Sequence, residues 1–287
     1  MTGILDKFDL TGRVAIVTGG AGLLGKEFCR TLAEAGAVVV VADINEDAAT
    51  AEADALQTKA LQAESLLVEG FRSIGIKTDV TDPSSVRRMV DTTLEAFGRL
   101  DILVNSAALD PKVDPQALAN RTTPLGSFED YPLDAWNTAL NVNLTGMFLI
   151  TQACVAPMLA QGKKGSIINI CSTYGLNGPD QRIYRKEDRP QTFKPVYYSV
   201  TKAGVLGFTK YLAAYFMGTQ IRVNALTPGG VYNQHDDTFV ANYSAKTILG
   251  RMAHKDEMNG GLLFLASDAS SYMTGANLVV DGGWTAW

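Results

Sequence analysis

Residues 13–25 read Arg-Val-Ala-Ile-Val-Thr-Gly-Gly-Ala-Gly-Leu-Leu-Gly, and this stretch decides the fold class. An apolar run, Val14–Thr18, ends in closely spaced glycines, and a helical pattern follows from Lys26 to Ala35. Glycines have no Cβ, so an anion can approach the free N–H groups and the positive dipole end of the following helix. The stretch therefore predicts a strand, a tight turn and a helix whose N-terminus binds a phosphate through the backbone.

A second apolar run, Val38–Ala42, ends in Asp43, eighteen residues after Gly25. An acidic side chain at this place suits the two ribose hydroxyls of NAD and would repel the 2′-phosphate of NADP. The glycines alone would fit an ordinary loop. Together with the strand, the helix and Asp43 they favour a dinucleotide site, with NAD as the cofactor.

Composition places the chain among globular proteins that bury a full core, with 287 residues, 46% hydrophobic and 19% charged. A net charge of −5 disfavours a nucleic-acid or anionic-membrane partner. Cys29, Cys154 and Cys171 lie far apart and far from His235 and His254, so we expect no disulfide framework and no metal site. The N-terminus has no apolar leader, and no apolar run reaches the roughly eighteen residues of a membrane span, so we expect a cytoplasmic protein.

Strand-like and helix-like segments alternate along the chain. The expected strands are seven apolar, β-branched runs: Val14–Thr18, Val38–Ala42, Ile74–Lys77, Ile102–Asn105, Ser166–Ile170, Ile221–Leu226 and Asn277–Val280. Helical spacing occupies 45–70, 82–98, 133–160 and 196–216. Such alternation predicts an α/β doubly wound Rossmann fold, a parallel sheet of about seven strands flanked by helices. No linker or repeat is evident, so we expect one NAD-binding domain over 1–287.

Three segments interrupt this alternation, near 110–132, 175–197 and 232–250, and we expect them to wall a substrate pocket. The first is rich in proline and follows a strand end, where open α/β sheets place their ligand crevice. The second carries five cationic and three acidic residues between 175 and 195. This composition fits a solvated surface loop as well as a lid that attracts an anionic substrate. Its position beside the next motif favours the lid.

Tyr198 and Lys202 lie four residues apart, on one face of an expected helix. A tyrosine titrates near pH 10, so its use as an acid and base near neutrality requires stabilisation of the phenolate by about 4 kcal/mol. A lysine ammonium and a cationic nicotinamide ring could supply this stabilisation. The spacing also arises by chance, so the assignment depends on the motifs around it.

The chain resembles the short-chain dehydrogenase/reductase family across nearly its whole length. The motifs that carry the resemblance, in order, are Thr18–Gly25, Asn105-Ser-Ala-Ala108, Asn143 within Asn-Val-Asn-Leu-Thr-Gly, Ser172, Tyr198-x-x-x-Lys202, Asn224-Ala-Leu-Thr-Pro-Gly229 and Val280-Asp-Gly-Gly283. The resemblance implies an NAD-dependent oxidoreductase that interconverts a secondary alcohol and a ketone. It implies Tyr198 as general acid and base, Lys202 on the nicotinamide ribose, Ser172 on the reacting oxygen and Asn143 holding a proton-relay water.

The same resemblance implies the residues that hold NAD: Gly19, Gly22, Leu23, Leu24, Gly25, Asp43, Asp79, Val80, Asn105, Ala107, Tyr198, Lys202, Pro228, Gly229 and Val231. Asp79 would meet the adenine, Asn105 would lie along the adenosine ribose, and the Pro228–Gly229 turn would cradle the nicotinamide amide. Without the family, Asp79 would fit a helix cap and Asn105 a turn residue.

Two departures from the family pattern bear on function. Leu23 replaces a glycine, which resembles the spacing of the sugar epimerase and dehydratase relatives. Asn143 and the Asp-Gly-Gly ending resemble the single-domain dehydrogenases instead, and we favour these. Ser172 precedes Tyr198 by 26 residues, more than is usual, because of the insertion near 175–197.

The insertions supply Lys112, Arg121, Arg182 and Arg185, so we expect a small-molecule substrate that is a polar sugar, sugar acid or glycan precursor. One alternative is a nucleotide-sugar epimerase or dehydratase that retains its NAD, and another is a non-catalytic NAD sensor. The resemblance also implies a homotetramer or homodimer formed through the helices at 133–160 and 196–216. Burial in a core would explain their apolar content equally well.

Overall fold

The computed structural model of the chain describes residues 3–62, 73–110, 126–185 and 190–287. Seven strands form one parallel sheet in the order β3-β2-β1-β4-β5-β6-β7. Their bounds are β1 Val14–Thr18, β2 Val38–Asp43, β3 Ile74–Lys77, β4 Ile102–Asn105, β5 Gly165–Ile170, β6 Ile221–Pro228 and β7 Asn277–Val280. The order reverses between β1 and β4, which confirms the doubly wound fold and places the ligand crevice of such sheets outside this pair.

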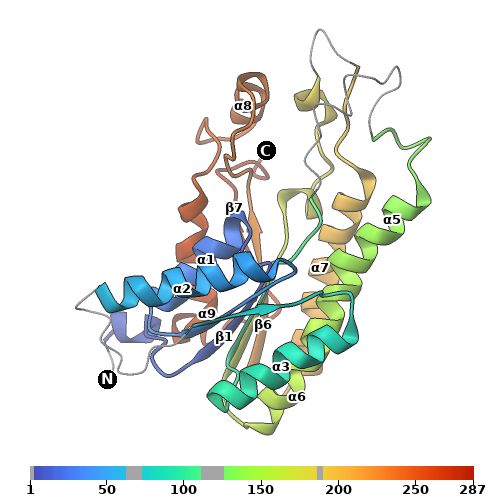
Figure 1. Cartoon of the computed structure of the whole chain (residues 1–287). Helices are drawn as coiled ribbons and strands as arrows, with labels where there is room; N and C mark the ends of the chain where they lie inside the picture. The colour runs from blue at the N-terminus through green and yellow to red at the C-terminus, as the bar shows by residue number, and fades with distance from the viewer. Residues whose placement is uncertain (1–2, 63–72, 111–125, 186–189) are drawn as a thin grey trace.

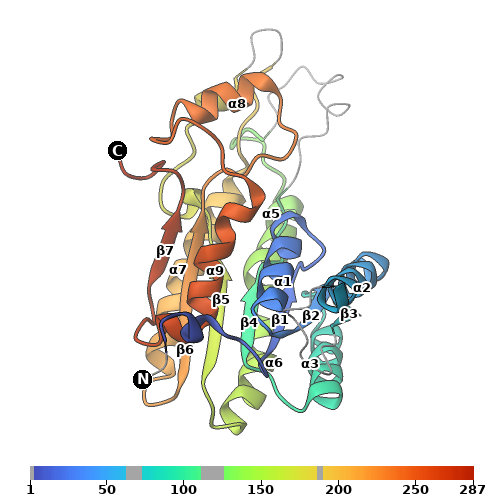
Figure 2. The ribbon, with the colours of Figure 1, turned by 90° about the vertical axis from the view of Figure 1, so that its left-hand side faces the viewer.

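Helices cover both faces of the sheet, as Figures 1 and 2 show. One face packs against α1, α2 and α9, and the other against α3, α6 and α7. Their bounds are α1 Leu23–Glu34, α2 Glu46–Gln62, α3 Pro83–Phe97, α6 Met147–Ala160, α7 Val196–Tyr215 and α9 Asn259–Ala266. Because both faces are covered, the central strands β1, β4 and β5 are buried at every residue, which explains why their residues are mostly apolar.

The expected helix at 133–160 consists of three parts. It begins as α5 Leu133–Leu140, passes through a π-helical turn, η3 Asn141–Gly146, and continues as α6. Within the described ranges this is one helix long and apolar enough to match a membrane span, with a mean hydropathy of 1.5. Its inner side chains Ile150, Cys154 and Met158 are buried in the core cluster beneath the sheet, so this face of the helix serves packing.

Several elements lie above the carboxyl ends of the strands. Helix α8, Asp237–Ser244, stands there with the short turns η4 Thr173–Gly175 and η5 Gln181–Tyr184 (Figures 1 and 2). They belong to the second and third insertions, so these two insertions meet at the expected ligand end of the sheet. Some residues in our predictions lie outside the described ranges: Lys112 and Arg121, residues 63–70 of the second expected helix, and residues 186–189 of the second insertion.

Candidate active site

The glycine loop after β1 leaves the start of α1 open to a ligand. Helix α1 begins after Gly22 without a side-chain cap, so the amides of its first turn have no intrahelical acceptor. Gly19 has a φ of +64°, and a Cβ there would lie 2.9 Å from the Cα of Ala107. A Cβ on Gly25 would overlap the carbonyl oxygen of Gly19. Glycine is therefore required at both positions, and the amides of Leu23, Leu24 and Gly25 fit a pyrophosphate.

Asp43 lies beside this loop, at the end of β2. Its two carboxylate oxygens accept hydrogen bonds from the amides of Ala21 and Asn45, each at 3.1 Å. The carboxylate therefore faces the place where the adenosine ribose of a dinucleotide would lie. The residues present fit such a cofactor.

In the segment after β3, Asp79 is not the residue that caps the next helix. Asp79 accepts hydrogen bonds from the amide and the hydroxyl of Thr81, at 2.8 and 2.7 Å, while Asp82 caps α3 through the amide of Ser84. Val80 is buried against the end of the π-turn, where a Cβ on Gly146 would lie 2.7 Å from its methyl group. Asp79 is thus fixed at a strand end without being the helix cap.

Asn105 does not face the crevice as we expected. Its side chain is buried and donates hydrogen bonds to the Thr151 hydroxyl at 2.9 Å and the Asn169 carbonyl oxygen at 2.8 Å. This amide ties β4 to α6 and β5, so its side chain is not available to an adenosine ribose. The next amides, those of Ser106 and Ala107, donate to the Thr18 hydroxyl at 3.1 and 3.2 Å and join the ends of β4 and β1.

Ser172 and Tyr198 meet although 26 residues separate them. Ser172 follows β5 and caps the turn η4, accepting the Tyr174 amide at 3.2 Å, and Tyr198 lies in the first turns of α7, which packs against η4. The Ser172 hydroxyl lies close enough to the Tyr198 phenol to lower the pKa of Tyr198. The long insertion therefore leaves the serine and tyrosine in contact.

Lys202 is buried one turn further along α7. Its ammonium donates to the carbonyl oxygen of Ile170 at 2.9 Å and lies 5.8 Å from the centre of the Tyr198 ring. Burial lowers the pKa of Lys202. The ammonium and the phenol thus share one site, as the spacing predicted.

The phenol of Tyr198 is harder to ionise here than we expected. Burial raises the pKa of Tyr198, the negative charge of Asp110 raises it further, and the Ser172 hydrogen bond lowers it. In this arrangement the Lys202 ammonium is directed at a backbone carbonyl, and desolvation of the phenol dominates. Tyr198 is therefore protonated near neutral pH in the chain itself.

Asn143 sits inside the π-helical turn and joins two segments. Its carbonyl oxygen accepts the Leu109 amide at 2.6 Å, and its amide group donates to the Leu109 carbonyl at 3.2 Å and to the Thr201 hydroxyl at 3.3 Å. Asn143 therefore holds the segment after β4 against α7. Single π-turns inside α-helices are common at functional sites, and no local sequence pattern predicted this one.

The loop after β6 closes the other end of the crevice. The Gly229 amide donates to Val280 at 2.9 Å, and a Cβ on Gly229 would lie 2.7 Å from the Cα of Asp281. Val231 pairs with Ala253. This close packing fixes the Pro228–Gly229 turn at the carboxyl end of β6.

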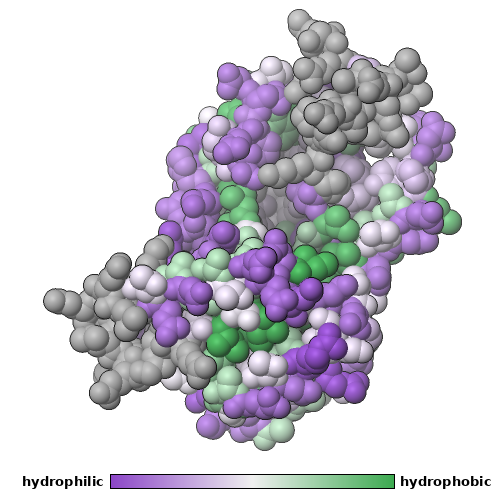
Figure 3. All heavy atoms as spheres, in the orientation of Figure 1, coloured by the Kyte–Doolittle hydropathy of each residue, from purple (hydrophilic) through white to green (hydrophobic). Residues whose placement is uncertain are grey.

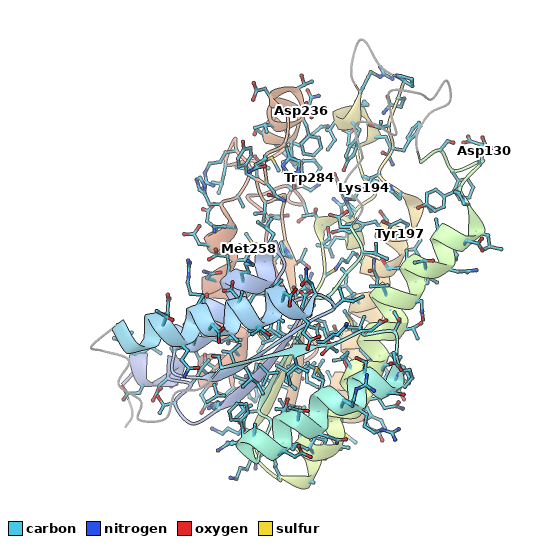
Figure 4. The ribbon with its side chains drawn as sticks, viewed as in Figure 1. Asp130, Lys194, Tyr197, Asp236, Met258 and Trp284 are labelled. Carbon is cyan, nitrogen blue, oxygen red and sulfur yellow. The ribbon has the colours of Figure 1, made fainter. Side chains whose placement is uncertain are left out.

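Lys194 and an aromatic cluster are features that our sequence reasoning missed. The ammonium of Lys194 lies 4.0 Å from the centre of the Tyr198 ring and 2.5 Å from a carboxylate oxygen of Asp110. Tyr174 meets the rings of both Tyr198 and Trp284 edge-on, with ring centres 6.3 Å apart in each pair. Trp284, labelled in Figure 4, stacks on the ring of Tyr243. The cationic composition of the insertion was the only signal for Lys194.

The described residues enclose little empty volume near this chemistry. A cavity of about 60 Å³ lies behind the Pro228–Gly229 turn, far below the roughly 300–1,000 Å³ of ligand pockets. A larger one, of about 400 Å³, lies among Arg13, Arg99 and Asp101 at the amino ends of the strands, away from the site. On the face shown in Figure 3 the surface is hollowed above the strands, between α8 and α5. Among the described residues, the candidate site is thus a surface hollow at the carboxyl ends of the strands.

Comparison with known proteins identifies the class. Residues 20–285 match the family model described as Enoyl-(Acyl carrier protein) reductase. The chain is 38% identical to 3-alpha-(or 20-beta)-hydroxysteroid dehydrogenase of Mycobacterium tuberculosis, over 96% of this chain and 91% of that one. It is 34% identical to cis-4-hydroxycyclohexanecarboxylate dehydrogenase of Sinomonas cyclohexanicum, over 96% and 97%. The chain belongs to the short-chain dehydrogenase/reductase family of oxidoreductases, as its motifs predicted.

Solved structures agree with this assignment. A gluconate 5-dehydrogenase from Burkholderia cenocepacia, in complex with NADP and tartrate, superposes with a TM-score of 0.82 at 30% identity, over 99% of this chain and all of that one. A short-chain dehydrogenase from Leptospira borgpetersenii with bound NAD⁺ gives a TM-score of 0.78 at 32% identity, over 99% and 96%. Members of the family bind a nicotinamide dinucleotide, and these two relatives hold different ones.

Proposed function

We propose that the chain is an NAD-dependent dehydrogenase that interconverts a secondary alcohol and a ketone on a polar substrate, of which a sugar acid or related hydroxy acid is the preferred kind. The observation that carries this proposal is the partly buried Tyr198 phenol, close to the Ser172 hydroxyl and to the Lys202 ammonium, at the carboxyl ends of the strands. Dehydrogenases of cyclic hydroxy acids and of gluconate among the relatives support it.

Each catalytic side chain would act at a stated atom. The bound nicotinamide supplies the hydride acceptor for oxidation or the hydride donor for reduction. The Tyr198 oxygen takes the proton of the alcohol, or returns it to the ketone oxygen, while the Ser172 hydroxyl donates a hydrogen bond to the same substrate oxygen. Lys202 would stabilise the phenolate and hold the nicotinamide ribose. Asn143 would hold a water that relays the proton between Tyr198 and the solvent.

Asp43 supports NAD rather than NADP. Its carboxylate is already hydrogen-bonded at the edge of the glycine loop, and a 2′-phosphate placed there would meet a like charge. The cofactor would be held by Gly19, Gly22 and the first turn of α1, by Asp79 and Val80, by the backbone near Ala107, and by the turn from Pro228 to Val231. We further propose a single domain, a cytoplasmic location and assembly as a homotetramer or homodimer.

The two alternatives are less well supported. An epimerase or dehydratase would retain its NAD and produce no net NADH, whereas the relatives that span this chain are dehydrogenases. A sensor would not require a phenol, a serine and an ammonium in contact.

A turnover panel tests the proposal. Purified protein is offered NAD⁺ with neutral sugars, sugar acids, cyclic hydroxy acids and steroid alcohols, and NADH formation is followed. We expect turnover of the polar alcohols, and a fall of about 10²- to 10⁴-fold in kcat for Tyr198→Phe with NADH affinity retained. Activity confined to steroids would refute the polar substrate. Copurified NAD without net NADH would favour the epimerase.

A further inference from the structure

Lys194 is held in place above the proposed catalytic tyrosine by its own insertion. Its amide donates to the side-chain oxygen of Gln181 at 2.9 Å, and its carbonyl accepts from the same side chain at 3.4 Å. The ammonium lies over the Tyr198 ring at 4.0 Å, and only 15% of the side chain is exposed. In Figure 4, Lys194 lies above the strand ends, near the start of α7. This is a positioned charge at the site of the chemistry.

The carboxylate that pairs with the Lys194 ammonium can be replaced by another anion. Asp110 lies 2.5 Å from the Lys194 ammonium, yet 53% of its side chain is exposed. An exposed carboxylate returns to water at little cost, because ion pairs at the surface contribute at most about the energy of a weak hydrogen bond. The more buried ammonium still requires an anion when Asp110 leaves. A carboxylate from a ligand can therefore replace that of Asp110 and leave the ammonium paired, while Asp110 keeps its charge in solvent.

The neighbouring cations are otherwise engaged. Lys202 donates to the Ile170 carbonyl, and Arg182 and Lys246 both pair with Asp180, at 2.7 and 2.6 Å. Arg182 is also 77% exposed. Among these charges, Lys194 combines contact with the Tyr198 ring and a solvent-exposed counterion.

We propose that Lys194 binds a carboxylate of the substrate in exchange for Asp110, while the alcohol or ketone oxygen of the same molecule lies at Tyr198 and Ser172. The inference rests on the proposed function and narrows its substrate class to hydroxy acids and the corresponding oxo acids. Asp110 then acts as an internal competitor that neutralises Lys194 between substrates.

Binding of a non-reacting acid tests the inference without turnover. Cyclohexanecarboxylate and cyclohexanecarboxamide are titrated calorimetrically into the protein saturated with NADH. The wild type should bind the acid at least tenfold more tightly than the amide, because a hydrogen bond to a charged group is stronger than a neutral one. Lys194→Met should abolish this preference. Asp110→Asn should strengthen it several-fold, since the competing carboxylate is gone.

Arg182→Gln is the matched control, because it removes a positive charge from the same insertion away from Tyr198. It should keep the preference for the acid. An unchanged preference in Lys194→Met, an equal loss in Arg182→Gln, or a wild type that does not bind the acid would each overturn the inference. The turnover panel stands apart from this test: oxidation of neutral alcohols without preference for the acid would leave the proposed function intact and exclude the Lys194 anchor.

Discussion

Replacement of Gly25 by alanine should disable cofactor binding while leaving every proposed catalytic side chain in place. The new Cβ would overlap the carbonyl oxygen of Gly19 and lie 2.8 Å from the Cα of Gly20. Both neighbours are backbone, so the loop must move, and such overpacking costs about 1–3 kcal/mol of stability. The movement would withdraw at least one amide from the pyrophosphate, a hydrogen bond worth about 1.5–3 kcal/mol. We expect the Kd for NADH to rise about 10- to 100-fold.

Two other glycines separate binding from stability. Gly22 has an ordinary φ of −77°, and a Cβ there would approach a single atom, the Gly19 oxygen, at 3.1 Å. Gly22→Val should therefore remain folded while its side chain covers the amides of α1, and NADH binding should fall at least about tenfold. Gly207 lies on α7 and a Cβ there would meet nothing within 4 Å. Gly207→Ala should leave NADH affinity unchanged and stabilise the helix by about 0.5–1 kcal/mol.

The measurements are fluorescence titration with NADH and urea unfolding of each variant. The reasoning is refuted if folded Gly25→Ala binds NADH as the wild type does. It is also refuted if Gly22→Val binds NADH normally, because the first turn of α1 would then not contact the cofactor.

Three further results are expected. Asp43→Ser should lower kcat/KM with NAD⁺ about tenfold or more, because hydrogen bonds to the ribose are lost. It should also raise the relative rate with NADP⁺, because the charge that repels the 2′-phosphate is removed. An unchanged ratio of the NAD⁺ and NADP⁺ rates would contradict the role of Asp43. Asp110→Asn should lower the pH at which oxidation of a neutral alcohol is half-maximal. The Asp110 charge raises the pKa of Tyr198, so its removal favours the phenolate. A shift of the kcat profile to higher pH would refute Tyr198 as the base. Asp101→Asn should destabilise the fold by about 3 kcal/mol in urea, because the buried carboxylate accepts the Val14 amide and two hydrogen bonds from Arg99; a loss below about 1 kcal/mol would show that the pair contributes little.

The strands could be predicted because the central ones are buried on both faces, so nearly all residues of a run such as Val14–Thr18 are apolar. Helix α9 could not, because Gly260 and Gly261 lie in its first turn and reduce its helical signal. The structure explains Gly261: a Cβ there would lie 3.2 Å from Leu226 and 3.3 Å from Leu278. The glycine lets the helix approach the sheet closely, a tertiary reason that local propensity does not record.

The candidate site shows the same division. Tyr198 and Lys202 were found because their spacing is local, and Ser172 because a family motif marks it. Asn105 was misplaced because the family resemblance assigned it to the adenosine ribose, whereas its side chain lies in the core between β4 and α6. The Lys194–Asp110 pair joins residues 84 positions apart, and no local pattern connects them.

The π-turn gives this long-range pair a fixed geometry. Asn143 holds both backbone groups of Leu109, the residue directly before Asp110, and also reaches Thr201 on α7. The carboxylate of Asp110 is thus attached to a backbone that the π-turn anchors, while Lys194 lies two residues before α7 and over the Tyr198 ring. Because both charges are positioned relative to the same helix, a shift of the π-turn would move the counterion and the phenol together. We infer that Asn143 contributes to substrate placement through Asp110 as well as to any proton relay.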